Sequence, residues 1–139
     1  MPQKLDAKRE AEIREQFPSY PFPMLLGMQI DMLEYGQARL RLPYGQDITQ
    51  GMGYIHGGVI GALCDTSVAI ALFTMLEKDQ KILTVEFKIN FIAPADKEVR
   101  SVARIIHKGR RTAVGDVEVM SCDGVLVAKG LVTYYIIEE

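Results

Sequence analysis

A single carboxylate, Asp65, interrupts an uncharged stretch of the sequence that spans residues 57–76. The glycines Gly57 and Gly58 open this stretch, directly after His56. A carboxylate can accept a proton or attack an electrophilic carbon, and the first free N–H groups of a helix can polarise a carbonyl oxygen. The residue types therefore point to acid–base or nucleophilic chemistry on a carbonyl compound.

Each of these residues also has a structural explanation. Glycine suits the start of a helix and permits close approach of a neighbouring chain, and Asp65 could form a structural hydrogen bond to a nearby loop. A bare charge is costly among Leu63, Cys64 and Val68, so we favour a chemical use for the carboxylate. Cys64 points elsewhere on a helix, which argues against a cysteine nucleophile.

The stretch that carries Asp65 is predicted to be a buried helix. Its length and the lack of breakers after Gly61 favour a helix over a strand. A 3.6-residue period places small residues on the side of Asp65 and bulky apolar residues on the other side, namely Val59, Ile60, Leu63 and Ile70. The stretch is long enough to cross a bilayer, but its central carboxylate and its lack of basic flanks argue against a membrane span.

The remaining segments predict a helix, a lid and a sheet. Residues 4–16 have helical composition, and the prolines that follow predict an extended aromatic lid up to residue 24, which could line an acyl or aryl pocket. Strands are expected over residues 28–35, 37–42, 83–91, 99–107, 112–120 and 125–136, with the last four in a meander. In the third strand, alternation places Thr84 on the polar face together with Glu86.

These elements predict an α+β fold, in which one antiparallel sheet with a non-sequential strand order curls around the central helix. Uncovered sheet edges favour a dimer. The 139 residues suit a single domain, 1–139, with residues 1–24 forming the helix and lid. A net charge of −2 argues against nucleic-acid binding. The polar N-terminus and two cysteines favour the cytoplasm, and two histidines without a Cys-x-x-Cys motif give little support for a metal site.

Two motifs occur in this order along the sequence: His56-Gly57-Gly58 with Asp65 eight residues after the first glycine, and the turn Gly109-Arg110-Arg111-Thr112. With them, the sequence over about residues 20–136 resembles the PaaI-like branch of the hotdog-fold acyl-CoA thioesterases. The resemblance implies hydrolysis of acyl-CoA to a free acid and CoA. It also implies that CoA is part of the substrate, that no separate cofactor is needed, and that the chain forms a homodimer or homotetramer.

The resemblance also suggests individual roles. Asp65 matches the general base or nucleophile, and the Gly57 N–H matches the group that polarises the thioester carbonyl. His56 is expected to orient neighbouring groups, since it has no visible acid partner. Gln50 stands where the family has an amide residue, and Thr84 matches a small hydroxyl residue that could hold the attacking water.

Further residues are expected to contact the substrate. Gly58 leaves room for its backbone. The cations Lys108, Arg110 and Arg111 crowd one turn, which is either a solvated hairpin tip or a site for the CoA phosphates.

The spacing of Gly57 and Asp65 adds a geometric constraint. Eight residues of helix span about 12 Å, whereas groups that act on one carbon must lie within about 3–3.5 Å of it. The site should therefore pair Gly57 of one subunit with Asp65 of its twin. Two other functions stay open: a hotdog hydratase or dehydratase on acyl thioesters, and a non-catalytic acyl-CoA binding module.

Overall fold

The computed structural model describes residues 3–138. Its helices are α1 (Ala7–Gln16), α2 (Pro21–Leu26) and α3 (Gly57–Phe73), with short 3-10 turns η1 (Phe17–Ser19) and η2 (Gln46–Ile48). Its strands are β1 (Gln29–Glu34), β2 (Gln37–Leu42), β3 (Gln80–Phe91), β4 (Val99–Lys108), β5 (Thr112–Ser121) and β6 (Leu126–Glu138).

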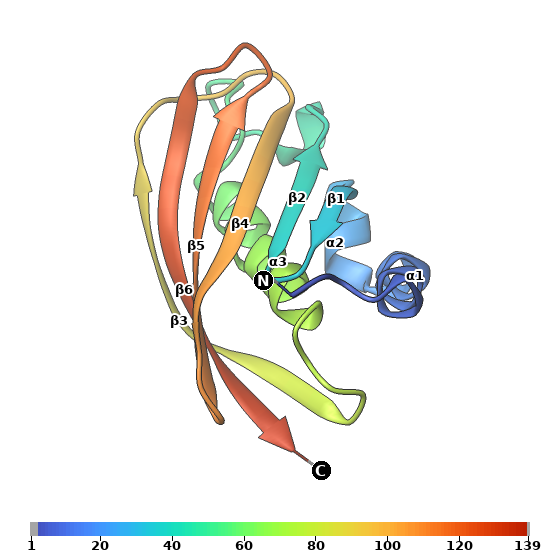
Figure 1. Cartoon of the computed structure of the whole chain (residues 1–139). Helices are drawn as coiled ribbons and strands as arrows, with labels where there is room; N and C mark the ends of the chain where they lie inside the picture. The colour runs from blue at the N-terminus through green and yellow to red at the C-terminus, as the bar shows by residue number, and fades with distance from the viewer. Residues whose placement is uncertain (1–2, 139) are drawn as a thin grey trace.

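The six strands form one antiparallel sheet in the order β1-β2-β4-β5-β6-β3. The predicted non-sequential order is confirmed, but the predicted four-strand meander is wrong in one respect. Only β4, β5 and β6 follow one another, whereas β3 pairs with β6 at the far edge (Figure 1). The strand that follows the central helix in sequence is therefore an edge strand.

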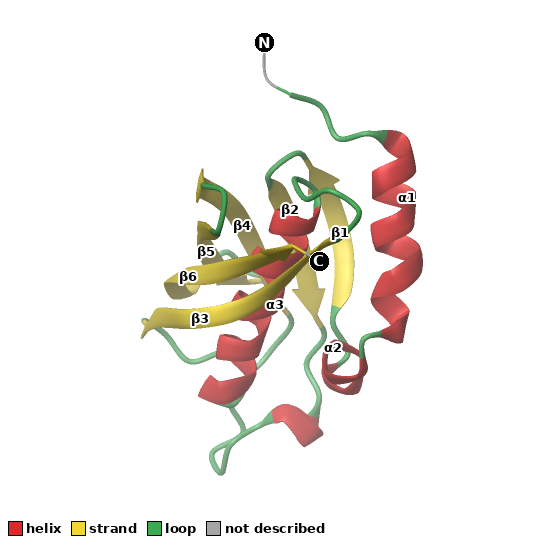
Figure 2. Ribbon diagram, turned by 90° about the horizontal axis from the view of Figure 1, so that it is seen from below, coloured by secondary structure: helices red, strands yellow, loops and turns green. Residues whose placement is uncertain are grey.

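The sheet curls around α3, which lies against its concave face while α1 and α2 flank the β1 side (Figure 2). The bulky face predicted for this helix is largely buried, with Ile60, Leu63 and Ile70 at most 2% exposed. Contact with the sheet is close at Gly115 of β5, where an added Cβ would lie 2.5 Å from the side chain of Val68. The prediction of an α+β hotdog fold with a buried central helix is thereby confirmed.

The N-terminal segment differs from the predicted extended lid. Residues 21–26 form the helix α2, because proline at a first helical position needs no N–H partner and has a helix-compatible φ. Gly27 ends this helix with a φ of 85°, which is in the left-handed region. Upstream, α1 begins at Ala7 rather than at residue 4, where the Asp6 side chain accepts a hydrogen bond from the Lys8 N–H.

A β-bulge near the start of β3 reverses the predicted strand parity. Thr84 pairs with Tyr134, while Glu86 pairs with Thr133, so the register shifts between the two β3 residues. Since neighbouring residues of β6 face opposite sides of the sheet, Thr84 and Glu86 also lie on opposite faces. Simple alternation placed them together, and the bulge instead turns Thr84 inward toward α3.

Candidate active site

The carboxylate of Asp65 lies half-buried on α3 and is held by hydroxyl groups from two strands. The Thr84 hydroxyl on β3 donates to Asp65 Oδ1 over 2.9 Å. The Tyr134 hydroxyl on β6 donates to the same oxygen and also lies within hydrogen-bond distance of the Asp65 backbone carbonyl. Asp65 Oδ2 has no hydrogen-bond partner among residues 3–138, so one oxygen is anchored and the other is available.

Tyr134 is the member of this group that the sequence did not suggest. It is separated from Asp65 by 69 residues and is 3% exposed. Burial, and then the negative charge of Asp65, raise the pKa of the Tyr134 hydroxyl well above its ordinary value. The hydroxyl therefore stays protonated and can act as a donor. Only its inward position on β6, in register with Thr84, reveals the contact.

A largely apolar pocket of about 350 Å³ opens beside Asp65. Its lining comes from the lid, from α3, from the start of β3 and from β6, and consists of Tyr20, Pro23, Asp65, Thr66, Ala69, Ile70, Phe73, Ile82, Leu83, Thr84 and Tyr134. Lid residues thus reach the pocket that holds the carboxylate, although part of the lid is helical. A substrate group bound here would be largely hydrocarbon.

The start of α3 lies eight residues before Asp65 on the same helix. The Nδ1 atom of His56 accepts a hydrogen bond from the Gly58 N–H over 2.7 Å and so caps the helix. The Gly57 N–H has no acceptor among the described residues. An added Cβ at Gly58 would lie 2.9 Å from His56 Nδ1, whereas at Gly57 it would make ordinary contact with the Phe91 ring. His56 thus occupies one donor of the first turn and leaves that of Gly57 open.

Gln50 serves its own loop in this structure. Its side-chain carbonyl accepts from the backbone N–H groups of Met52 and Tyr54. An isolated bridge between Thr49 and Ile55 then holds the loop beside the start of α3. Gln50 thus lies in the loop that leads to His56, and its side-chain carbonyl oxygen is already hydrogen-bonded within that loop. A direct role for Gln50 in chemistry stays a prediction.

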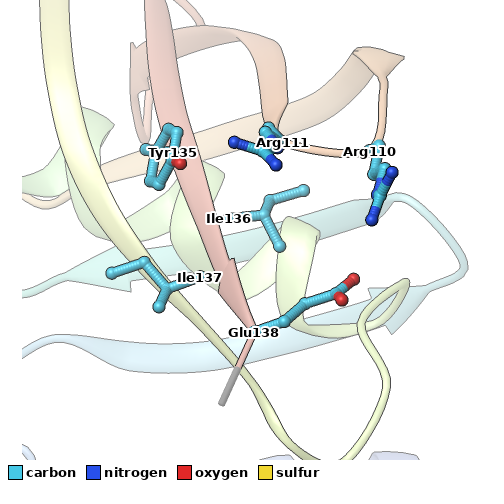
Figure 3. A pocket seen from close by; sticks show the side chains of 6 residues that line it. All are labelled: Arg110, Arg111, Tyr135, Ile136, Ile137 and Glu138. Atoms are coloured by element: carbon cyan, nitrogen blue, oxygen red, sulfur yellow. The ribbon is translucent and has the colours of Figure 1, made fainter.

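The basic turn lies at the end of a second pocket, of about 230 Å³, between the β4–β5 turn and the end of β6 (Figure 3). Arg110 and Arg111 line it, together with Tyr135 and the Glu138 carboxylate. The backbone carbonyl of Arg111 accepts from the Ile136 N–H over 2.7 Å, two residues after Tyr134 along β6. Lys108 is exposed at the end of β4. The turn is thus attached to the strand that carries Tyr134.

Gly57 and Asp65 lie on one continuous helix, so the helical rise of about 12 Å between them holds in the structure. The adjacent edge strand, β3, presents large apolar side chains to solvent, among them Leu83 at 60% and Phe91 at 58% exposed. The rings of Phe87 and Phe91 also lie against α3, over the small residues Gly61 and Gly57 respectively. An exposed apolar edge of this kind is uncommon unless another chain covers it.

The described residues form neither a candidate metal site nor a candidate membrane-spanning helix. Within residues 3–138, no three His, Cys, Asp or Glu side chains gather in a way that could hold a metal ion. None of the helices formed by these residues has the length and apolar character needed to cross a membrane.

Comparison with known proteins places the chain in a family. Residues 52–128 match the model of the thioesterase superfamily. An esterase-named protein of Saccharolobus solfataricus is 31% identical over 81% of this chain and 80% of its own length. A protein of Listeria monocytogenes named 1,4-dihydroxy-2-naphthoyl-CoA hydrolase is 28% identical over 68% of this chain and 77% of its own. The chain therefore belongs to the thioesterase superfamily.

Solved structures support the same assignment. A thioesterase family protein from Silicibacter pomeroyi superposes with a TM-score of 0.89 at 29% identity, covering 94% of this chain and 99% of that one. The Escherichia coli PaaI protein superposes with a TM-score of 0.86 at 21% identity, covering 96% of each chain, which shows the shared fold. The predicted membership in the thioesterase superfamily and the predicted hotdog fold, which the chain shares with PaaI, are confirmed.

The cysteine beside Asp65 gives a first prediction. Burial and the adjacent carboxylate raise the pKa of the Cys64 thiol to about 12, so at pH 8 only about one thiol in ten thousand is ionised. Cys122 is exposed. A thiol-reactive dye at pH 8 should label one thiol in the native protein and two after unfolding.

The variant Cys122→Ser should show no native labelling and should keep its thioesterase activity after treatment with the dye. Stoichiometric labelling of this variant with parallel loss of turnover would instead make Cys64 a reactive nucleophile.

Proposed function

We propose that this protein hydrolyses acyl-CoA thioesters to free acid and CoA, with Asp65 as general base or nucleophile. The observation that carries the proposal is a carboxylate with one anchored and one available oxygen, set beside an apolar pocket. Membership of the thioesterase superfamily supports thioester cleavage. The CoA portion is supported by the basic turn and by the name of the Listeria relative.

The chemistry needs an electrophile and a base. In the general-base route, Asp65 Oδ2 accepts a proton from water while the water oxygen bonds to the thioester carbon. The carbonyl electrons move to oxygen, where the Gly57 N–H and the positive end of α3 stabilise the oxyanion. The carbon–sulfur bond then breaks and CoA leaves as the thiolate. In the nucleophilic route, Asp65 attacks first and water hydrolyses the resulting anhydride.

The pocket beside Asp65 suits the acyl group. Its walls are hydrocarbon from Pro23, Ala69, Ile70 and Phe73, so burying an apolar acyl chain or aryl ring there is favourable. The polar groups of a hydrophilic acyl moiety would find few hydrogen-bond partners on these walls. Acyl-CoA esters of apolar acids are therefore the expected substrates.

The proposed site is shared between two subunits. Because about 12 Å of helix separates Gly57 from Asp65, the donor and the base must come from different chains to meet at one carbonyl. The unpaired, apolar edge of β3 is the surface that a second copy would cover. Thr84 lies on this strand and Phe91 covers Gly57, so pairing there brings both ends of the site to the interface. A homotetramer would be built from two such dimers.

The first test of the function is Asp65→Asn. The amide has nearly the shape of the carboxylate and can still accept from Thr84 and Tyr134, so the fold should persist. It can neither take a proton nor attack, and kcat for acyl-CoA should fall by about 10²–10⁴-fold. Thiol release from a panel of acyl-CoA esters measures the effect.

The matched control is Asp116→Asn, which makes the same change on the outward face of β5 and should leave turnover unchanged. Near wild-type turnover in Asp65→Asn would remove this carboxylate from the mechanism.

The basic turn gives a second test. Replacing Arg110 and Arg111 with Ala should raise KM for acyl-CoA about tenfold, since two charge-assisted phosphate contacts would be lost. A short acyl-pantetheine ester lacks the nucleotide phosphates and should be hydrolysed as before.

The control removes two charges from the opposite end of β4, by changing Lys97 and Arg100 to Ala, and should alter neither substrate. Equal effects of the Arg110 and Arg111 changes on both esters would show that the turn is an ordinary solvated hairpin tip.

A further inference from the structure

A buried hydroxyl contacts the Asp65 carboxylate beside a pocket whose lining carries no cation. Among the described residues, no lysine, arginine or histidine lines this pocket. An anion in such surroundings needs donors to replace water. Among residues 3–138, its side-chain donors are the hydroxyls of Thr84 and Tyr134.

We propose that Tyr134 is a positioning residue for Asp65: its hydroxyl anchors Oδ1 and leaves Oδ2 as the oxygen that reacts. This inference rests on the proposed function, because it assigns a role within the same site. Tyr134 does not itself contact the reacting atoms. It acts through the orientation of Asp65.

The direction of the hydrogen bond follows from the chemistry of the groups. Both atoms of Asp65 near the Tyr134 hydroxyl are acceptors, so the phenol must donate. The raised pKa of Tyr134 keeps that proton in place over the working pH range. The other titratable groups around Asp65 are Cys64 on α3 and Tyr20 of the lid, both with raised pKa values and therefore neutral.

The geometry also fixes which way the carboxylate turns. Thr84 and Tyr134 come from neighbouring strands in register and converge on one oxygen. Tyr134 is 3% exposed, whereas the edge strand that carries Thr84 is exposed. The tyrosine is therefore the firmer anchor. Without it, Asp65 could rotate about its side-chain bonds, and small displacements of a reacting group lower rates by up to about 10²-fold.

The test compares Tyr134→Phe with wild type in kcat and KM for one acyl-CoA. The ring is kept and only the hydroxyl is lost. We expect kcat to fall about 10–100-fold with KM within about twofold, because the substrate still binds while the reacting oxygen is no longer held in place.

Two further variants complete the series. Thr84→Val removes the other donor while Tyr134 stays, and should also lower kcat with little change in KM, which keeps the test open if Tyr134→Phe does not fold. Tyr35→Phe is the matched control, since it removes a tyrosine hydroxyl at the β1–β2 turn, and should leave kcat and KM unchanged. Thermal melts monitor the fold of each variant.

Wild-type kcat in folded Tyr134→Phe, or a loss confined to KM, would overturn the inference and leave Tyr134 a packing residue. Wild-type kcat in Thr84→Val would overturn the claim that hydroxyl donors hold Asp65 in its reactive orientation. Asp65→Asn in the same series distinguishes a failure of the proposed function from a failure of the inference about Tyr134. If Asp65→Asn retains full activity, the proposed function fails and the inference with it. If it is inactive while Tyr134→Phe behaves as wild type, only the inference fails.

Discussion

The cost of keeping a carboxylate on an otherwise apolar helix is the constraint on which the rest of this structure depends. Asp65 lies half-buried on α3, and hydroxyls from β3 and β6 replace the water that it loses. That arrangement requires β3 to pair with β6 rather than with its sequence neighbour β4. It also requires a bulge that turns Thr84 inward. The strand order and the local irregularity of the sheet therefore both serve one polar contact in the core.

The same strand order leaves β3 at an edge, with large apolar side chains exposed. In a monomer, such an exposed edge would favour aggregation by pairing with other chains. In the proposed dimer it becomes the interface, and the separation of Gly57 from Asp65 along one rigid helix becomes the reason for having a partner. In this proposal the helix would supply a base to one site and a carbonyl-polarising end to the other. Stability of the pair and completion of the site would then depend on the same surface.

Most of the fold could be predicted from the sequence, because hydrophobic periodicity defines the buried helix and the strands locally. Asp65 stood out as the sole charge in an apolar run, and Thr84 through family resemblance. Three features could not be found this way. Tyr134 reaches Asp65 across 69 residues of sequence, the bulge inverts an otherwise regular alternation, and α2 begins with a proline that equally fits an extended chain. Each depends on tertiary packing rather than on local pattern.

The central claim is that one reaction site takes Gly57 from one chain and Asp65 from another. The most direct measurement mixes two inactive variants, Gly57→Val and Asp65→Asn, by unfolding and refolding them together. Random pairing makes half of the dimers hybrids with one intact site each, so activity should recover to about a quarter of the wild-type value. Hybrids isolated through two different tags that remain at background activity would contradict the shared site and place the whole reaction within one chain.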